Sequence, residues 1–158
     1  MTRVYLSLGS NIEPERHLCA ALDELAQRFG ELVTSPAYRF AAVGFDGPDF
    51  INLAVGLDTD LSAQAMNDWL HALEDRLGRR RDVPRFSSRT LDIDIVLFGA
   101  NVVSGPGNLH IPRPELKHAF VLQPLADIGA DVSHPQSGIS IAQLWRECAE
   151  PPGTVCSL

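Results

Sequence analysis

The apolar residues of the chain recur with two different spacings, one typical of helices and one typical of strands. One helical segment follows Pro14 and ends near Gly30, and a second begins after Ser62, a residue suited to cap a helix, and ends at Gly78. The apolar positions three or four residues apart are Leu18, Leu22, Leu25 and Phe29 in the first, and Met66, Trp69, Leu70, Leu73 and Leu77 in the second. Each helix is therefore expected to cover a core with one face.

Extended segments flank these two helices. Residues 3–8, 32–40, 50–57 and 91–97 are rich in β-branched, aromatic and other apolar side chains, and turn residues separate them. The resulting order is strand, helix, strand, strand, helix, strand. This order is typical of the α+β class and of the ferredoxin-like βαββαβ sandwich, in which both helices pack on one face of an antiparallel sheet.

The remainder of the chain predicts a C-terminal extension to this sandwich. Short strands are expected at 102–103 and 109–111, and helical turns at 120–128 and 140–148. The tail from residue 150 to residue 158 is expected to fray. Because no repeat or linker interrupts the chain, we interpret residues 1–158 as a single domain.

Composition narrows the classes of partner. The 158 residues are 45% apolar and carry a formal net charge of −7, which excludes a disordered chain and disfavours nucleic acid as a partner. No apolar run approaches a membrane span of roughly 20 residues, and no signal peptide is recognisable. The three cysteines show no metal-binding spacing. We therefore expect a cytoplasmic monomer that has no membrane partner and binds small molecules.

The basic residues are concentrated in one segment. Twelve of the thirteen are arginines, and six of these arginines lie between residues 76 and 89, where only Asp82 opposes them. The segment has no apolar periodicity and contains Pro84, so we expect a loop. Arginine binds phosphate groups through two parallel hydrogen bonds. The segment therefore favours a phosphate ligand over the alternative of a solvated surface loop.

Two carboxylates follow this arginine-rich segment. In residues 91–97, Asp92 and Asp94 alternate with Leu91, Ile93, Ile95 and Leu97, which places the aspartates on the opposite face of the strand. Carboxylates two residues apart on one strand lie roughly 6–7 Å from each other and repel unless a cation intervenes. Mg²⁺ prefers such ligands together with substrate phosphates. The alternative is an amphipathic strand with a solvated face.

A third pattern indicates a planar ligand. Asn52 lies within a predicted strand, where a polar amide needs hydrogen-bond partners. Phe50 and Phe120 could stack on a flat, amide-rich heterocycle, although both could also be ordinary core residues. Gly9-Ser10-Asn11, after the first strand, lacks the three-glycine fingerprint of a dinucleotide site and reads as a turn.

Several segments, in this order, resemble one enzyme family. They are Tyr5-Leu-Ser-Leu-Gly-Ser-Asn11, Pro48-Asp-Phe-Ile-Asn52, Leu73-Glu-Asp-Arg-Leu-Gly-Arg79, Ser88-Arg-Thr-Leu-Asp-Ile-Asp-Ile95 and Phe120-Val-Leu-Gln-Pro-Leu125. Over roughly residues 3–145 the chain resembles 6-hydroxymethyl-7,8-dihydropterin pyrophosphokinase, an enzyme of folate biosynthesis. The resemblance implies the ferredoxin-like fold and the transfer of the β,γ-diphosphate of ATP to the pterin hydroxymethyl group, with release of AMP.

The resemblance also implies roles for individual residues. It assigns two Mg²⁺ ions to Asp92 and Asp94, and the phosphates of ATP to Arg79, Arg81 and Arg89. On the pterin side it assigns Val43, Gly44, Phe50, Asn52, Asp92 and Phe120. On the nucleotide side, besides the arginines, we expect Glu74, His71, His110, Arg113 and His118.

Some positions depart from the family pattern. Phe86-Ser87-Ser88 replaces a Trp-Gly-Pro-like triplet, Arg113 stands where a histidine is usual, and His118 stands where an arginine is usual. These departures leave open a related pyrophosphokinase with altered pterin specificity or low activity. A non-enzymatic ferredoxin-like binding module, for example for RNA, is the alternative of another class.

Overall fold

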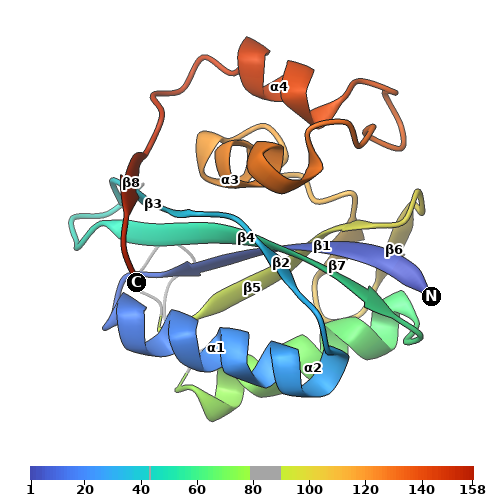
Figure 1. Ribbon diagram of the computed structural model, residues 1–158, viewed down its shortest axis with the longest axis horizontal. Coiled ribbons are helices and arrows are strands. Elements are labelled where there is room, and N and C mark those ends of the chain that lie inside the picture. The colour runs from blue at the N-terminus through green and yellow to red at the C-terminus, as the bar shows by residue number, and fades with distance from the viewer. Residues whose placement is uncertain (43, 79–89) are drawn as a thin grey trace.

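In the computed structural model, which describes residues 1–42, 44–78 and 90–158, a central antiparallel sheet lies between two layers of helices (Figure 1). The elements are β1 Thr2–Ser10, α1 Pro14–Phe29, β2 Val33–Thr34, β3 Ala37–Phe40, β4 Phe50–Thr59, α2 Ala63–Arg76, β5 Asp92–Phe98, β6 Val103–Gly105, β7 Leu109–Ile111, α3 Ala119–Gly129, α4 Ile141–Glu147 and β8 Thr154–Cys156. The helices and strands predicted up to residue 97 occur within a few residues of the expected bounds, except that the strand expected at 32–40 is divided into β2 and β3.

The order of the strands confirms the ferredoxin-like fold. The main sheet has the order β5-β1-β4-β3-β8, with β2 also paired to β4, and all of these pairings are antiparallel. The two long strands β1 and β4 are central, and β1 also pairs with β5. The short strands β6 and β7 form a separate hairpin.

Helices α1 and α2 cover one face of the sheet, as the apolar spacing predicts (Figure 1). Leu18 and Leu25 of α1 and Leu70 and Leu73 of α2 are completely buried in the core on this side. The Ser62 hydroxyl accepts a hydrogen bond from the Ala65 N–H at 3.1 Å and so caps α2. Burial of one apolar face of each helix therefore fixes this layer.

Helices α3 and α4 cover part of the opposite face (Figure 1). Leu122 and Leu125 of α3 and Ile141 of α4 pack with Ala54 and Val96 of the sheet in a second apolar cluster. The predicted C-terminal extension thus becomes a layer of its own, and the functional groups on this face lie where that layer leaves the sheet open.

Strand β5 differs from its predicted alternation at one position. Tyr5 pairs with Leu97 and Leu6 with Ile95, so Val96 is an extra residue in β5 and forms a bulge. Because the bulge reverses the alternation, Leu97 packs with α3 and α4 while Phe98 packs with α1 and α2. The prediction that Leu97 shares a face with Ile93 and Ile95 is therefore wrong. Asp92 and Asp94 precede the bulge and keep their predicted face.

The C-terminal tail also differs from the sequence expectation. We expected residues 150–158 to fray, whereas Thr154–Cys156 form β8 and extend the sheet beyond β3. Gly153 precedes this strand, exchanging hydrogen bonds with the side chain of Gln123 in α3: its N–H donates at 2.7 Å and its carbonyl accepts at 3.4 Å. Backbone pairing with β3, which no local sequence signal reveals, holds the tail in place.

Two further expectations can be compared with the structure. Cys19, Cys148 and Cys156 are free thiols. Among the described residues, no helix combines the length and the apolar character that a membrane crossing requires.

A buried tyrosine connects the sheet to α3 and provides a test of the packing. The Tyr38 hydroxyl of β3 donates a hydrogen bond to the Asp127 carboxylate of α3. Burial, this hydrogen bond and the negative charge of Asp127 raise the pKa of Tyr38 to about 12. We expect Tyr38→Phe to lower the free energy of unfolding by about 1 kcal/mol, because Asp127 is exposed and water can replace the lost donor.

The pH dependence of this loss has a definite sign. The folded protein keeps the Tyr38 proton to a higher pH than the unfolded chain. The contribution of protonated Tyr38 to the free energy of unfolding is therefore present below pH 10 and is lost as the pH rises towards 12. Urea unfolding of both proteins at pH 8 and pH 11 measures it. A difference that grows with pH, or no difference at pH 8, would contradict the prediction.

Candidate active site

The candidate site begins with a row of three residues across the sheet. Asn52 of β4 and Asp92 of β5 both lie directly opposite Gly9 of β1 in the strand register. Opposed residues of antiparallel strands share a face, and three adjacent strands place the outer Cα atoms about 10 Å apart. The next row on the same face contains Ala54, Ser7 and Asp94. Small side chains in the middle of both rows therefore form a floor with an amide on one side and two carboxylates on the other.

The two aspartates face away from α1 and α2, as predicted. Ile93, between them, is buried in the core, whereas Asp92 and Asp94 are only partly covered. Desolvation and then the charge of Asp92 raise the pKa of Asp94 well above its ordinary value, although the nearby Arg113 acts in the opposite direction. Paired carboxylates of this kind repel each other, and a divalent cation between them relieves that repulsion.

Arg113 is the described cation nearest to this pair. Its guanidinium lies 3.5 Å from Asp94 Oδ1 and donates hydrogen bonds of 2.8 Å to Glu115 and to the carbonyl of Asn108. The side chain is only 12% exposed. Glu115 and Asn108 therefore hold Arg113 in place beside the aspartates.

The amide of Asn52 is buried on the same face of the sheet as the aspartates. Asn52 is buried, and its Oδ1 atom has no hydrogen-bond partner within the part of the chain that the structure describes. A buried acceptor without a partner is costly unless a donor from a ligand reaches it. The Nδ2 atom lies over Gly9, because a Cβ atom on Gly9 would be 2.6 Å from it. Glycine at position 9 therefore leaves the room that the Asn52 side chain occupies.

The predicted aromatic pair occupies two different elements. Phe50 begins β4, where its ring meets Phe45 edge-on, with ring centroids 6.3 Å apart. Phe120 lies in the first turn of α3, and the ring of His118 stacks on it at 5.3 Å and 13°. Both phenylalanines are half-buried. Gly44, expected at the edge of the ligand, lies in the loop before Phe50 with φ +82°, a conformation that favours glycine.

The remaining predicted residues lie around the sheet edge formed by β5. Glu74 of α2 is buried, and its carboxylate accepts a hydrogen bond of 2.8 Å from the Ile93 N–H. His71 of α2 lies against the hairpin of β6 and β7, since a Cβ atom on Gly107 would be 3.6 Å from its ring. His110 is exposed on β7. The structure thus places Glu74 beside the aspartate strand and leaves the nucleotide roles of all three residues as predictions.

Four predicted residues, namely Val43, Arg79, Arg81 and Arg89, lie outside the described residues.

Sequence reasoning missed three residues that shape the site. Gly9 was interpreted as part of a turn, yet it separates Asn52 from Asp92. Glu115 positions Arg113, and Glu150 binds His118 with its carboxylate, 2.7 Å from Nδ1. Gly9 could have been found by aligning the predicted strands in antiparallel register. No local pattern distinguishes Glu150 from other exposed acidic residues.

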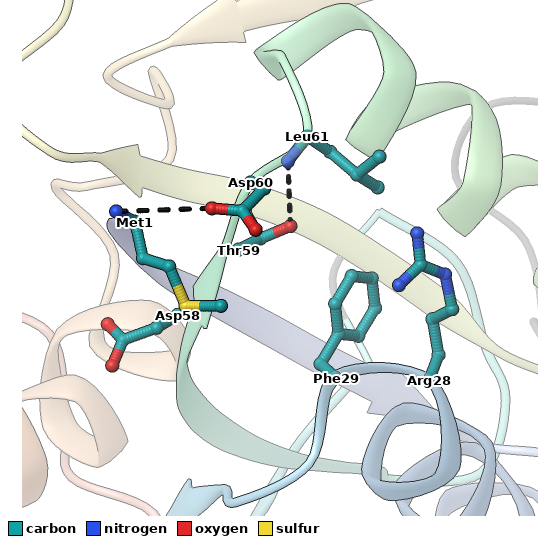
Figure 2. Close-up of a pocket in the computed structure, with 7 residues that line it drawn as sticks. All are labelled: Met1, Arg28, Phe29, Asp58, Thr59, Asp60 and Leu61. Atoms are coloured by element: carbon teal, nitrogen blue, oxygen red, sulfur yellow. Dashed lines mark hydrogen bonds and ion pairs between the residues drawn. The ribbon is translucent and has the colours of Figure 1, made fainter.

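One pocket of the structure lies far from these groups. A pocket of about 190 Å³ is lined by Met1, Arg28, Phe29, Asp58, Thr59, Asp60 and Leu61, near the opposite end of β1 (Figure 2). Its polar groups are partnered internally: the N-terminal amine lies 4.0 Å from Asp60, and the Leu61 N–H donates to Thr59. It offers nothing that resembles the row of Asn52, Gly9 and Asp92.

The carboxylates of Asp92 and Asp94 fit a metal ion that is also bound by phosphate oxygens of a substrate. Within the described ranges, no group of three or more His, Cys, Asp or Glu side chains could hold an ion by itself. Asp92 and Asp94 supply two hard oxygen ligands, which suits Mg²⁺ because this ion is commonly held by one or two carboxylates plus phosphates and water. The fold and the site together define a ferredoxin-like domain that presents a buried amide and two carboxylates on the same face of its sheet.

Comparison with known proteins identifies the family. The family model described as 7,8-dihydro-6-hydroxymethylpterin-pyrophosphokinase (HPPK) matches residues 5–130. The chain is 40% identical over 152 residues to the 2-amino-4-hydroxy-6-hydroxymethyldihydropteridine pyrophosphokinase of Pseudomonas aeruginosa, covering 92% of this chain and 91% of that protein. It is 34% identical to the protein of the same name from Haemophilus influenzae, covering 95% of each. The chain belongs to the HPPK family, which confirms the resemblance found in the sequence.

Solved structures support the fold. The chain of Plasmodium falciparum HPPK-DHPS superposes with a TM-score of 0.70 at 14% identity, covering 92% of this chain and 44% of that one. At this identity the likeness concerns the fold, which agrees with the strand order described above.

Proposed function

We propose that the protein transfers a diphosphate group from ATP to the hydroxymethyl group of 6-hydroxymethyl-7,8-dihydropterin and releases AMP, as a step of folate biosynthesis. The observation that carries this proposal is the row of Asn52, Gly9 and Asp92. In this row a buried amide oxygen, which has no hydrogen-bond partner among the described residues, faces the carboxylate strand across Gly9, with the outer Cα atoms about 10 Å apart. That spacing suits a substrate with an amide-like ring at one end and an acceptor hydroxyl at the other.

The pterin side of the site is supported by hydrogen bonding and by shape. Asn52 Oδ1 can accept a hydrogen bond from an N–H or amino group of the ring. Phe50 and Phe120 supply two aromatic faces, from β4 and from α3, between which a flat ring would stack. We assign Gly44, and Val43 beside it, to the edge of the same ligand.

The phosphate side of the site is supported by charge. We propose that Asp92 and Asp94 hold two Mg²⁺ ions, and that Asp92 also contacts the pterin. When bound, Mg²⁺ neutralises the negative charge of the triphosphate and of the leaving group. Arg113 contributes a positive charge from the chain itself, held beside Asp94 by Glu115. We assign Arg79, Arg81, Arg89, Glu74, His71, His110 and His118 to the nucleotide as well.

In the proposed reaction the pterin hydroxyl oxygen attacks the β-phosphorus of ATP, the bond from that phosphorus to the oxygen of AMP breaks, and the hydroxyl proton is lost to solvent. The chain acts mainly by positioning and by electrostatics. Asn52 and the phenylalanines orient the pterin, and the cationic side chains align the triphosphate with it. We further propose a cytoplasmic monomer, a prediction that light scattering of the purified protein tests for the oligomeric state.

An AMP-release assay tests the proposal. With ATP, Mg²⁺ and 6-hydroxymethyl-7,8-dihydropterin present, we expect AMP to form in equal amount with the diphosphorylated pterin. Omission of the pterin or chelation of the metal with EDTA should reduce AMP to the background rate. Product formation that persists in EDTA would refute the metal dependence. A panel of pterin alcohols tests the related hypothesis of altered specificity, which predicts faster turnover of an alcohol other than the standard precursor.

A further inference from the structure

Helix α3 begins without a cap of its own. His118 is its N-cap residue, but the side chain accepts no hydrogen bond from the helix, and the first turn contains no acidic residue. The first N–H groups of a helix have no intrahelical acceptor, and a negative charge near them is favourable. In α3 the acceptor is Glu150, which lies 31 residues after Ala119 in the sequence. Its Oε1 atom accepts a hydrogen bond of 2.8 Å from the Ala119 N–H.

The same carboxylate also holds the His118 ring. His118 Nδ1 donates to Glu150 Oε2 at 2.7 Å. Partial burial tends to raise the pKa of Glu150, but the hydrogen bonds from Ala119 and His118 outweigh it, and the pKa is lowered. The His118 ring in turn lies nearly parallel to Phe120 at 5.3 Å. A single carboxylate therefore fixes both the backbone before Phe120 and the ring that stacks on it.

The segment that carries Glu150 is anchored to both walls of the pterin site. Gly153 exchanges hydrogen bonds with Gln123 of α3, the helix that bears Phe120. On its other side Gly153 lies against the Phe40 ring, because a Cβ atom there would be 2.6 Å from a ring carbon. Phe40 pairs with Phe50 in the register of β3 and β4. The C-terminal segment thus connects the strand of one aromatic wall with the helix of the other.

We propose that Glu150 is a positioning residue for pterin binding, which holds Phe120 in its stacking position through His118 and the start of α3. The inference rests on the proposed function, since it concerns the same pterin site. Without the carboxylate, the Ala119 N–H and the His118 Nδ1–H lose their acceptor, and the ring behind Phe120 is free to turn. A mobile Phe120 must be ordered by each pterin that binds, and this ordering weakens affinity.

Binding measurements with a filled nucleotide site test the inference. The dissociation constant of the pterin is measured by calorimetry with Mg²⁺ and saturating α,β-methylene ATP, which cannot transfer the diphosphate. We expect Glu150→Ala to weaken pterin binding about tenfold, because each pterin that binds must then order Phe120. The matched control is Glu147→Ala, which removes an exposed carboxylate of the same segment that binds Gln143. It should leave the constant unchanged.

A double-mutant cycle separates positioning from a general structural effect. If Glu150 acts through Phe120, Glu150→Ala should weaken pterin binding about tenfold in the natural protein and less than about twofold in a Phe120→Ala background. Equal weakening in both backgrounds would overturn the inference. If Glu150→Ala unfolds at the assay temperature, the same measurements are made with Glu150→Gln. The amide oxygen of Gln can still accept the hydrogen bond from the Ala119 N–H, but its NH₂ group cannot accept one from His118 Nδ1–H.

The outcomes distinguish this inference from the function on which it rests. A natural protein that neither binds the pterin nor releases AMP would refute the proposed function. A natural protein that does both, with Glu150→Ala and Glu150→Gln binding pterin equally well, would overturn only the role of Glu150.

Discussion

Replacing Asp94 with asparagine is expected to reduce AMP release by at least about 10³-fold and, at the same time, to stabilise the metal-free protein. The loss of rate follows from the role proposed for Asp94 as a metal ligand, because a bound metal is worth several kcal/mol of charge stabilisation and each 1.4 kcal/mol equals tenfold. The gain in stability follows from the repulsion that Asp94 experiences from Asp92. Asparagine keeps the shape of the side chain and removes the charge.

The stability of the metal-free protein is expected to decrease as the pH rises and Asp94 ionises. Desolvation and the Asp92 charge raise the pKa of Asp94 well above the ordinary value of 3.8. A carboxyl with a raised pKa favours the folded state while it is protonated, so its contribution is fully present below pH 3.8 and is lost as the pH rises through the raised pKa. Above this raised pKa the natural protein carries the cost of ionising Asp94 beside Asp92, which the Asp94→Asn variant avoids.

Melting temperatures measure this trade-off between stability and activity. In EDTA at pH 7.5, Asp94→Asn should melt above the natural protein, and Mg²⁺ with ATP should raise the melting temperature of the natural protein much more than that of the variant. Asp58→Asn is the control, because Asp58 is a half-exposed strand carboxylate paired with Arg3 outside the site. A variant that melts lower in EDTA, or that retains a tenth of the activity, would contradict the prediction.

Replacing Gly9 with alanine is expected to weaken pterin binding by about 10- to 100-fold, because one methyl group in a filled space costs typically 1–3 kcal/mol when neighbours must move. The new Cβ atom would lie 2.6 Å from Asn52 Nδ2, closer than any stable contact. The Asn52 side chain must turn away, and its Oδ1 atom then leaves the position in which it meets the ring. The free energy of unfolding is expected to fall by the same amount, about 1–3 kcal/mol.

Gly56→Ala provides a matched control for this variant. Gly56 also lies inside a central strand, opposite Tyr5, and a Cβ atom there would be 3.2 Å from the Tyr5 ring. It should reduce stability without changing the pterin dissociation constant, measured as above with the nucleotide analogue bound. If Gly9→Ala binds pterin as tightly as the natural protein, Asn52 does not have the role that we propose.

The regular part of the fold was predictable because it depends on local periodicity. Helices α1 and α2 bury one apolar face each, and spacings of three and four residues record this in the sequence. The faces of Asp92 and Asp94 were predictable for the same reason, since alternation along a strand separates a buried face from an open one. The Val96 bulge was not predictable, because it depends on the register with β1 and not on the residues of β5.

The candidate site was predictable only in part. Asp92, Asp94 and Asn52 are recognisable because aspartate and asparagine are depleted in strands. Their distance from one another was not, because it depends on the order in which β4, β1 and β5 pair. Arg113 shows the same limit: its sequence neighbours are prolines, whereas its contact with Asp94 comes from a loop that returns to the sheet.

The sequence by itself therefore determined the class of fold, the carboxylate pair and the resemblance to the HPPK family, because each is a pattern of neighbouring or regularly spaced residues. Only the tertiary structure decided that Gly9 separates Asn52 from Asp92, that Glu115 holds Arg113 beside Asp94, and that Glu150 of the C-terminal segment binds the start of α3. The physical reason is that strand register and side-chain contacts between different elements depend on how the layers pack, which no local spacing records.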